Sequence, residues 1–330
     1  MSSFSAQSWA FNLHTSQEID EDEDDADLEE LGLPVPPPPP PPLAAPRRER
    51  KRSSAVEEPE VRRPIVPIVY EPTKKFALRA IQPGQLVQCN ITRVPNTTVI
   101  GGYPTFQLTG SQGGEFIMAA RRRKKSQTAN YLIGTDPEDL SKDSGSIVAK
   151  VRALDQVLVA GKSRLYNIYT NGDNPKDFVL EKNVREELAF VEYEKKEWGN
   201  RGPLRMTASI PVVDVDGRRR VVKPIDEDDV NHLMAWKDDS IANRDKIVTL
   251  KNKEAKIRAD TGAYVLDFGG RATKPSVKNI QLAVAGGDGA ISLQFGKIDT
   301  DEFTLDVRYP LSPAQAFGIC LSCFENNGHN

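Results

Sequence analysis

Two short stretches of the chain place cationic side chains where they could bind an anion. The first is AARRRKKSQTANYLIG, beginning at residue 119, which puts five consecutive cations, Arg121 to Lys125, between two apolar stretches. A solvated run of charge normally lies in a loop or tail, whereas this run leaves and re-enters apolar sequence within a few residues. We therefore expect the five side chains to be mounted on folded structure and to border a binding site.

The second stretch is SIVAKVRAL, residues 146 to 154. If it forms a β-strand, Val148, Lys150 and Arg152 share one face and the alternate apolar residues take the other. An arginine offers a planar fork to a phosphate and a lysine offers a point charge, so this pair is suited to hold phosphate. On spacing alone, the same two cations could equally serve to keep an outer sheet face soluble.

The sequence offers little for catalysis or for binding a metal. Its three histidines, His14, His232 and His329, are far apart and belong to no plausible Ser-His-Asp set or histidine metal cluster. Cys320 and Cys323 have the C-x-x-C spacing of redox and zinc sites, but they lie in an apolar stretch without cations, which favours buried small side chains. We expect a protein that is not an enzyme, with no catalytic residue, no metal and no cofactor.

Charge divides the chain into two parts. Residues 1 to 60 carry 14 acidic and 5 basic side chains, whereas the rest carry 33 acidic and 39 basic ones. The acidic block EIDEDEDDADLEE, the polyproline run and the basic patch RRERKR cannot bury enough apolar surface to fold. We therefore predict a disordered acidic and proline-rich tail over residues 1–72 and a mildly basic folded domain over residues 73–330.

The elements that must position the cations follow from the pattern of the folded part. Short β-branched and aromatic segments alternate with turn residues, which favours an all-β barrel or sandwich. The last segment, SPAQAFGICLSCF, instead starts with a helix cap and a first-turn proline at Ser312 and Pro313, and it is apolar on nearly every side. A helix without a polar face must be surrounded, and we expect it to fill the lumen of a closed sheet.

Several spaced motifs, taken in order, resemble those of the tubby-like protein family. They are CNITR, AARRRKKSQTANYLIG, AKVRAL, VREELAFV, RGPLRM, FGGRATKPSVKNIQL and LQFGKIDTDEFTLDVRYPLSPAQAFGICLSCF. The resemblance runs from about Lys74 to the C-terminus and identifies this part as a C-terminal tubby domain. It implies a mainly β fold, a closed twelve-stranded β-barrel around a buried hydrophobic C-terminal helix, which agrees with the pattern analysis.

The resemblance also implies a ligand and its contacts. Tubby domains bind phosphoinositides, chiefly phosphatidylinositol 4,5-bisphosphate, in a basic pocket on the barrel surface. The family's headgroup contacts correspond here to Arg121, Asn130, Lys150, Arg152 and Arg185. For the remaining cations of the run, Arg122, Arg123, Lys124 and Lys125, we expect an auxiliary role, a nonspecific attraction to an anionic membrane of about 1 kcal/mol each.

Function and location follow as expectations from the resemblance. We expect a monomeric adaptor in the cytoplasm and on the cytoplasmic face of the plasma membrane, which carries membrane-protein cargo to cilia. Its N-terminal tail would contact the intraflagellar-transport complex. The alternative is a regulator released from the membrane to the nucleus, where it would bind nucleic acid, and steep salt dependence would distinguish this role from headgroup recognition.

Overall fold

The structure is a computed structural model that describes residues 70–71, 73–96, 102–124, 128–154, 164–173, 183–194, 204–224, 232–240, 242–257 and 264–325. Nearly all of the tail predicted to be disordered, residues 1–72, lies outside these ranges, and so does Lys125.

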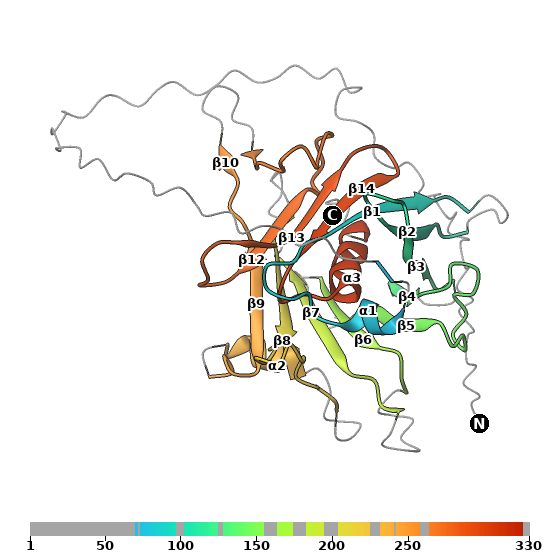
Figure 1. The fold of residues 1–330 in the computed structure, drawn as a ribbon. Helices are drawn as coiled ribbons and strands as arrows, with labels where there is room; N and C mark the ends of the chain where they lie inside the picture. The colour runs from blue at the N-terminus through green and yellow to red at the C-terminus, as the bar shows by residue number, and fades with distance from the viewer. Residues whose placement is uncertain are drawn as a thin grey trace, which may run out of the picture. The chain divides into compact units, whose positions relative to one another are not determined.

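Twelve strands of the described chain close into an antiparallel barrel (Figure 1). Around the barrel they follow the order β1-β14-β13-β12-β9-β8-β7-β6-β5-β4-β3-β2, and the ring is sealed where β1 pairs with β14, Val87 opposite Val307. The predicted twelve-stranded barrel is therefore confirmed. The strands are β1 (Val87–Val94), β2 (Thr105–Gly110), β3 (Phe116–Arg122), β4 (Asn130–Gly134), β5 (Ile147–Ala153), β6 (Leu165–Thr170), β7 (Glu187–Tyr193), β8 (Met206–Pro211), β9 (Ile247–Asn252), β12 (Ile280–Val284), β13 (Ile291–Lys297) and β14 (Glu302–Val307).

Helix α3 (Pro313–Phe324) occupies the inside of the barrel (Figure 1). It begins where the sequence predicts, because Ser312 and Gln315 form a reciprocal capping box: the Ser312 hydroxyl accepts from the Gln315 amide and the Gln315 side chain accepts from the Ser312 amide. Every residue from Pro313 to Cys323 is buried. The prediction of a surrounded apolar helix is therefore confirmed.

The fit between α3 and the strands is tight. A Cβ added at Gly318 would lie 2.8 Å from the Ile168 side chain of β6, so the helix backbone approaches this strand closely. Two polar side chains of the helix also have partners: the Gln315 side-chain amide donates to the Leu188 carbonyl at 2.6 Å, and the Ser322 hydroxyl lies 2.8 Å from that of Tyr193. The helix is thus held by shape and by hydrogen bonds.

The two cysteines of the C-x-x-C spacing are buried in this core, as their apolar surroundings predict. Burial raises the pKa of Cys323 to about 12 and raises that of Cys320 well above its usual value. Both thiols therefore stay protonated at neutral pH and act as small core side chains.

Two short helices and a two-stranded sheet accompany the barrel among the described elements. They are α1 (Lys74–Leu78), α2 (His232–Asp238), and the strand pair β10 (Lys256–Ile257) and β11 (Tyr264–Val265). Helix α2 starts on the buried carboxylate of Glu187, which accepts from the amides of His232 at 2.9 Å and Leu233 at 3.0 Å. Among the described helices, none has the length and apolar character needed to cross a membrane.

Replacing Phe317 by Ala should lower the free energy of unfolding by about 3–5 kcal/mol, because it opens a cavity in the fully buried helix–barrel contact. The matched control is Val215→Ala at a fully exposed turn residue, where a change within about 0.5 kcal/mol is expected. Urea unfolding followed by circular dichroism measures both. Equal midpoints for the two variants would show that α3 does not fill the barrel.

Candidate anion-binding site

One row of cross-strand partners sets the outer face of the barrel from β3 to β6. Arg121 is opposite Leu132, Leu132 is opposite Lys150, and Lys150 is opposite Tyr169. Directly opposed residues in an antiparallel sheet share a face, so these four side chains lie on the same side. The neighbours of Lys150 on β5, which point the other way, are fully buried in the core, and Lys150 therefore points outward as predicted.

A second row lies beside the first. Asn130 at the start of β4 is opposite Arg152 on β5, which is opposite Asn167 on β6. Asn130 is 5% exposed, so its side chain is almost fully shielded from solvent by its neighbours. The two rows together place Lys150, Arg152 and Asn130 on one patch of the outer wall.

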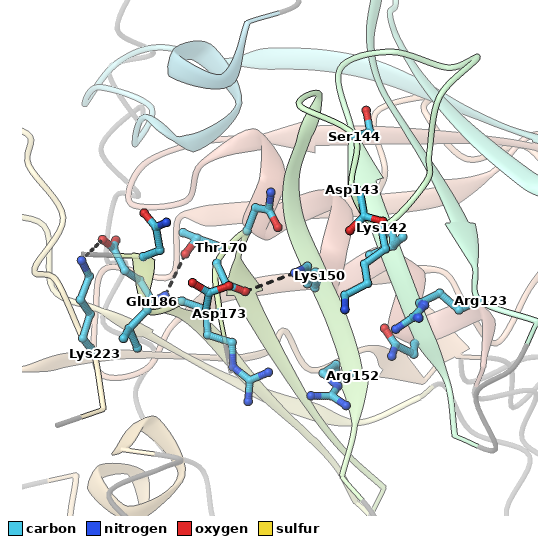
Figure 2. Close-up of a pocket in the computed structure, with 17 residues that line it drawn as sticks. Arg123, Lys142, Asp143, Ser144, Lys150, Arg152, Thr170, Asp173, Glu186 and Lys223 are labelled. Carbon is cyan, nitrogen blue, oxygen red and sulfur yellow. Dashed lines mark hydrogen bonds and ion pairs between the residues drawn. The ribbon is translucent and has the colours of Figure 1, made fainter. Parts of the chain in front are cut away.

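This patch is the floor of a pocket of about 730 Å³. Four of the five predicted contacts line it: Asn130, Lys150, Arg152 and Arg185. Lys150 and Arg152 are labelled in Figure 2. Within the described chain, the pocket is also lined by Arg123, Leu132, Lys142, Asp143, Ser144, Thr170, Asn171, Gly172, Asp173, Asn183, Val184, Glu186 and Lys223. The pocket is therefore built by strands β4, β5 and β6, by the segments that follow β3, β4, β6 and β8, and by the segment that precedes β7.

Arg185 reaches the pocket from the segment that precedes β7. Its guanidinium carbon lies 4.1 Å from the centre of the Tyr169 ring, a cation–π contact that fixes the plane of the fork. The Tyr169 hydroxyl in turn accepts from the Asn167 amide at 2.7 Å. A stacked arginine loses less side-chain freedom when it binds an anion, and so this one is preorganised.

The backbone beneath Arg185 depends on a glycine. A Cβ at Gly172 would lie 2.5 Å from the Asn183 carbonyl oxygen and 2.7 Å from the Arg185 amide nitrogen. The neighbouring Asp173 donates its amide to the Asn183 carbonyl at 2.7 Å and accepts from the Arg185 amide at 3.3 Å. The close approach of these two backbone segments therefore fixes the position of the Arg185 backbone, from which its side chain extends into the pocket.

The cations in the pocket repel one another electrostatically. The pKa of Lys150 is lowered, first by burial and then by the positive charges of Arg185, Lys142, Arg123 and Arg152. The Lys150 ammonium donates to the Gly172 carbonyl at 3.3 Å, which gives it a neutral partner. A concentration of positive charge at a concave, partly buried site is what an anion with several charges needs.

The cationic run is divided between two faces of the sheet. Arg123 lines the pocket, and Arg121 is exposed on the same face but lies outside the pocket. Arg122 lies between them and points to the other side, where it forms an ion pair with Glu325 at 3.3 Å and covers the ring of Tyr103. The charge of Arg122 is thus engaged at the end of the barrel, which differs from the auxiliary role expected for it.

Glu325 explains why the run lies against the core. It is the residue that caps the C-terminal end of α3, and its carboxylate also accepts a hydrogen bond from Tyr131 on β4. The buried helix therefore anchors Arg122, the second cation of the run, and strand alternation directs Arg121 and Arg123 outward on either side of it. Lys124 is exposed just beyond the strand.

Two cations of the pocket were not found from the sequence, Lys142 and Lys223. Lys142 lies in the loop between β4 and β5, and Lys223 lies in the segment between β8 and α2. Neither segment has strand periodicity, so the direction of these two side chains could not be predicted from the sequence.

The pocket also holds carboxylates on part of its wall. Asp143, Asp173 and Glu186 line it, and Glu186 forms an ion pair with Lys223 at 3.3 Å (Figure 2). The pocket is therefore mixed in charge, with its cations gathered around Lys150.

Comparison with known proteins finds one matching family model and several similar proteins. Residues 77–326 match the model of the Tub family. Human Tubby-related protein 1 is 36% identical over 267 residues, which is 80% of this chain and 47% of that protein. Tubby protein homolog 1 of Caenorhabditis elegans is 38% identical over 251 residues, 73% of this chain and 57% of that protein. The chain spans about half the length of the curated relatives it matches.

Replacing Gly172 by Ala should destabilise the folded protein by about 1–3 kcal/mol, because the added methyl group meets backbone atoms that can move only together with Arg185. Gly145→Ala is the matched control, since a Cβ there meets nothing within 4 Å; its stability should stay level or rise by less than about 1 kcal/mol. Thermal unfolding compares the two. A Gly172→Ala protein as stable as the control would mean that this close approach places no constraint on the site.

Proposed function

Because the chain belongs to the Tub family, we propose that its barrel binds a phosphorylated inositol headgroup, chiefly that of phosphatidylinositol 4,5-bisphosphate in the inner leaflet. In this proposal the protein is a membrane-associated adaptor and the binding involves no catalytic step. The bound group would lie over Lys150 and Arg152 in the pocket on the outer wall.

The observation that carries the proposal is the convergence of cations on one concave site. Arg123, Lys142, Lys150, Arg152 and Arg185 come from four different segments of the chain and line the same pocket. Burial and then their mutual repulsion lower the pKa of Lys150, and the repulsion is relieved when a multiply charged anion lies between them. A site whose only task was solubility would not gather these charges in a half-enclosed hollow.

Each side chain has a distinct role in this proposal. The forks of Arg152 and Arg185 each hold a phosphate through two parallel hydrogen bonds, and Lys150 contributes a point charge between them. The buried Asn130 amide donates to a phosphate oxygen or a ring hydroxyl. Arg121 lies next to the pocket on the exposed part of β3, where it would meet the membrane surface.

The cellular role is a further part of the proposal. By resemblance to its family, the protein would use the bound lipid to carry membrane-protein cargo toward cilia, and its N-terminal tail would contact the intraflagellar-transport complex. We place it in the cytoplasm and at the cytoplasmic face of the plasma membrane, as a monomer.

The alternative, a nuclear regulator that binds nucleic acid, has less physical support. A protein that binds the backbone of nucleic acid uses a stripe of cations spaced along a groove or surface. Here the cations converge on a hollow of about 730 Å³, and carboxylates line part of the same wall. Such a site suits a compact anion better than an extended one.

Replacing both Lys150 and Arg152 by Ala should weaken binding to vesicles that contain the bisphosphate lipid by about a hundredfold or more, because hydrogen bonds to charged groups contribute roughly 1.5–3 kcal/mol each. The melting temperature should change little, since both side chains lie on the outer face. Vesicle flotation measures binding, with phosphatidylserine vesicles of equal charge as the reference. Retained preference for the bisphosphate vesicles would place the site elsewhere.

The control for this experiment replaces Lys124 and Lys125 by Ala. These cations would act through the surface potential of the membrane, so their loss should reduce binding to all anionic vesicles alike, by about 1 kcal/mol per cation. If this variant lost the preference for bisphosphate vesicles and the first one kept it, the cationic run itself would be the specific site.

Binding should weaken as the pH rises from neutral toward the ordinary lysine pKa of 10.5. The pKa of Lys150 is lowered in the free protein, so its ammonium loses the proton at a lower pH than an ordinary lysine does. A bound phosphate favours the charged form and would raise this pKa again. Binding above neutral pH therefore takes up a proton. Lys150→Arg keeps its charge over this range and should lose most of the pH dependence in the same assay; an unchanged pH profile would show that Lys150 does not contact the anion.

A further inference from the structure

On the premise that the pocket binds a phosphorylated inositol ring, we propose that Glu186 and Lys223 determine how many phosphates that ring can carry. Their ion pair disfavours a third phosphate on one side of the pocket, so that a bisphosphorylated ring binds more tightly than a trisphosphorylated ring. Glu186 is the residue that determines this specificity, and Lys223 is its partner.

The charges of the pocket are unevenly placed. In Figure 2, Arg123, Arg152 and Lys150 lie on one side, and the Glu186–Lys223 pair lies on the other, with Asp173 and Thr170 between them. A ring whose phosphates contact the cations around Lys150 therefore presents its remaining positions toward Glu186. Hydroxyl groups at those positions can donate to a carboxylate, whereas a phosphate there is repelled.

Backbone hydrogen bonds hold Glu186 beside the pocket. Its amide donates to the Thr170 hydroxyl at 2.8 Å, and its carbonyl accepts from the Thr170 amide at 2.9 Å. Two hydrogen bonds to the end of β6 thus fix its backbone beside the pocket. The carboxylate can therefore withdraw from the pocket only by side-chain rotation.

Lys223 is positioned by the neighbouring residue. The Val222 carbonyl accepts from the Glu187 amide at 2.8 Å, which joins this segment to the start of β7. The Lys223 ammonium then lies 3.3 Å from the Glu186 carboxylate. A phosphate would therefore have to compete with Glu186 for Lys223.

The strength of this effect is limited by solvent. The Lys223 and Glu186 side chains are 37% and 33% exposed, so water and salt screen their charges in part. The pair can therefore shift the relative affinity for two ligands without preventing the binding of either one.

The test compares Glu186→Gln with the natural chain on phosphatidylcholine vesicles that contain either bisphosphorylated or trisphosphorylated inositol lipid, with total charge equalised by phosphatidylserine. The variant keeps its backbone hydrogen bonds, removes the repulsive charge and releases Lys223. We expect the ratio of trisphosphate to bisphosphate affinity to rise about tenfold, the change that corresponds to 1.4 kcal/mol. Lys223→Gln leaves the carboxylate uncompensated and should lower the same ratio.

Asp143→Asn is the matched control, because it removes one negative charge from another part of the same pocket wall. It should raise both affinities together and leave their ratio unchanged. Calorimetry with the free inositol bisphosphate and trisphosphate gives the same ratios without a membrane, and a change seen only on vesicles would mean that the bilayer, and not the pocket, selects.

An unchanged ratio in Glu186→Gln, or a rise no larger than that of Asp143→Asn, would overturn this proposal while leaving headgroup binding intact. If the natural chain bound phosphatidylserine vesicles as tightly as both inositol-lipid vesicles of equal charge, headgroup recognition itself would fail, and the role of Glu186 with it.

Discussion

Helix α3 meets the inner faces of the strands along its whole length, and no residue from Pro313 to Cys323 is left exposed. Such a helix would be unstable in water, and an empty barrel would lose the apolar contacts that close it. Each end of the helix is also tied to the wall. Arg219 donates to the Gln315 side chain at 2.8 Å and to the Leu78 carbonyl at 3.0 Å at one end, and Arg122 binds Glu325 at the other.

The packed core also fixes the positions of the side chains in the pocket on the outer wall. Ala149 and Val151 are fully buried in the core of the barrel. Because side chains alternate along β5, Lys150 and Arg152 face outward. The stacking of Arg185 on Tyr169 adds a third fixed cation. Because these groups are already in place, an anion would bind without the cost of ordering long flexible side chains.

The sequence could predict those features that depend on local periodicity. The capped apolar helix and the shared face of Lys150 and Arg152 follow from residues next to each other in the chain, and the structure has both. The opposite orientation of Arg122 was not foreseen, because it depends on Glu325, a residue about two hundred positions away. Lys142 and Lys223 were missed for a related reason: their segments have no repeating pattern, and only the tertiary structure brings them to the pocket.

The position of α3 in the chain bears on how the protein is made. The helix follows all twelve barrel strands, and the ring closes only when β1 pairs with β14, which directly precedes α3 among the described elements. A chain growing on the ribosome therefore exposes the apolar inner faces of its earlier strands until the last strand and the helix have emerged. Contacts between such distant segments form slowly, and the unpaired strand edges can join other chains in the meantime. The apolar inner faces of the strands are therefore covered only after α3 has been made, and a chain that stops between β14 and α3 has all twelve strands but lacks the helix that covers their inner faces.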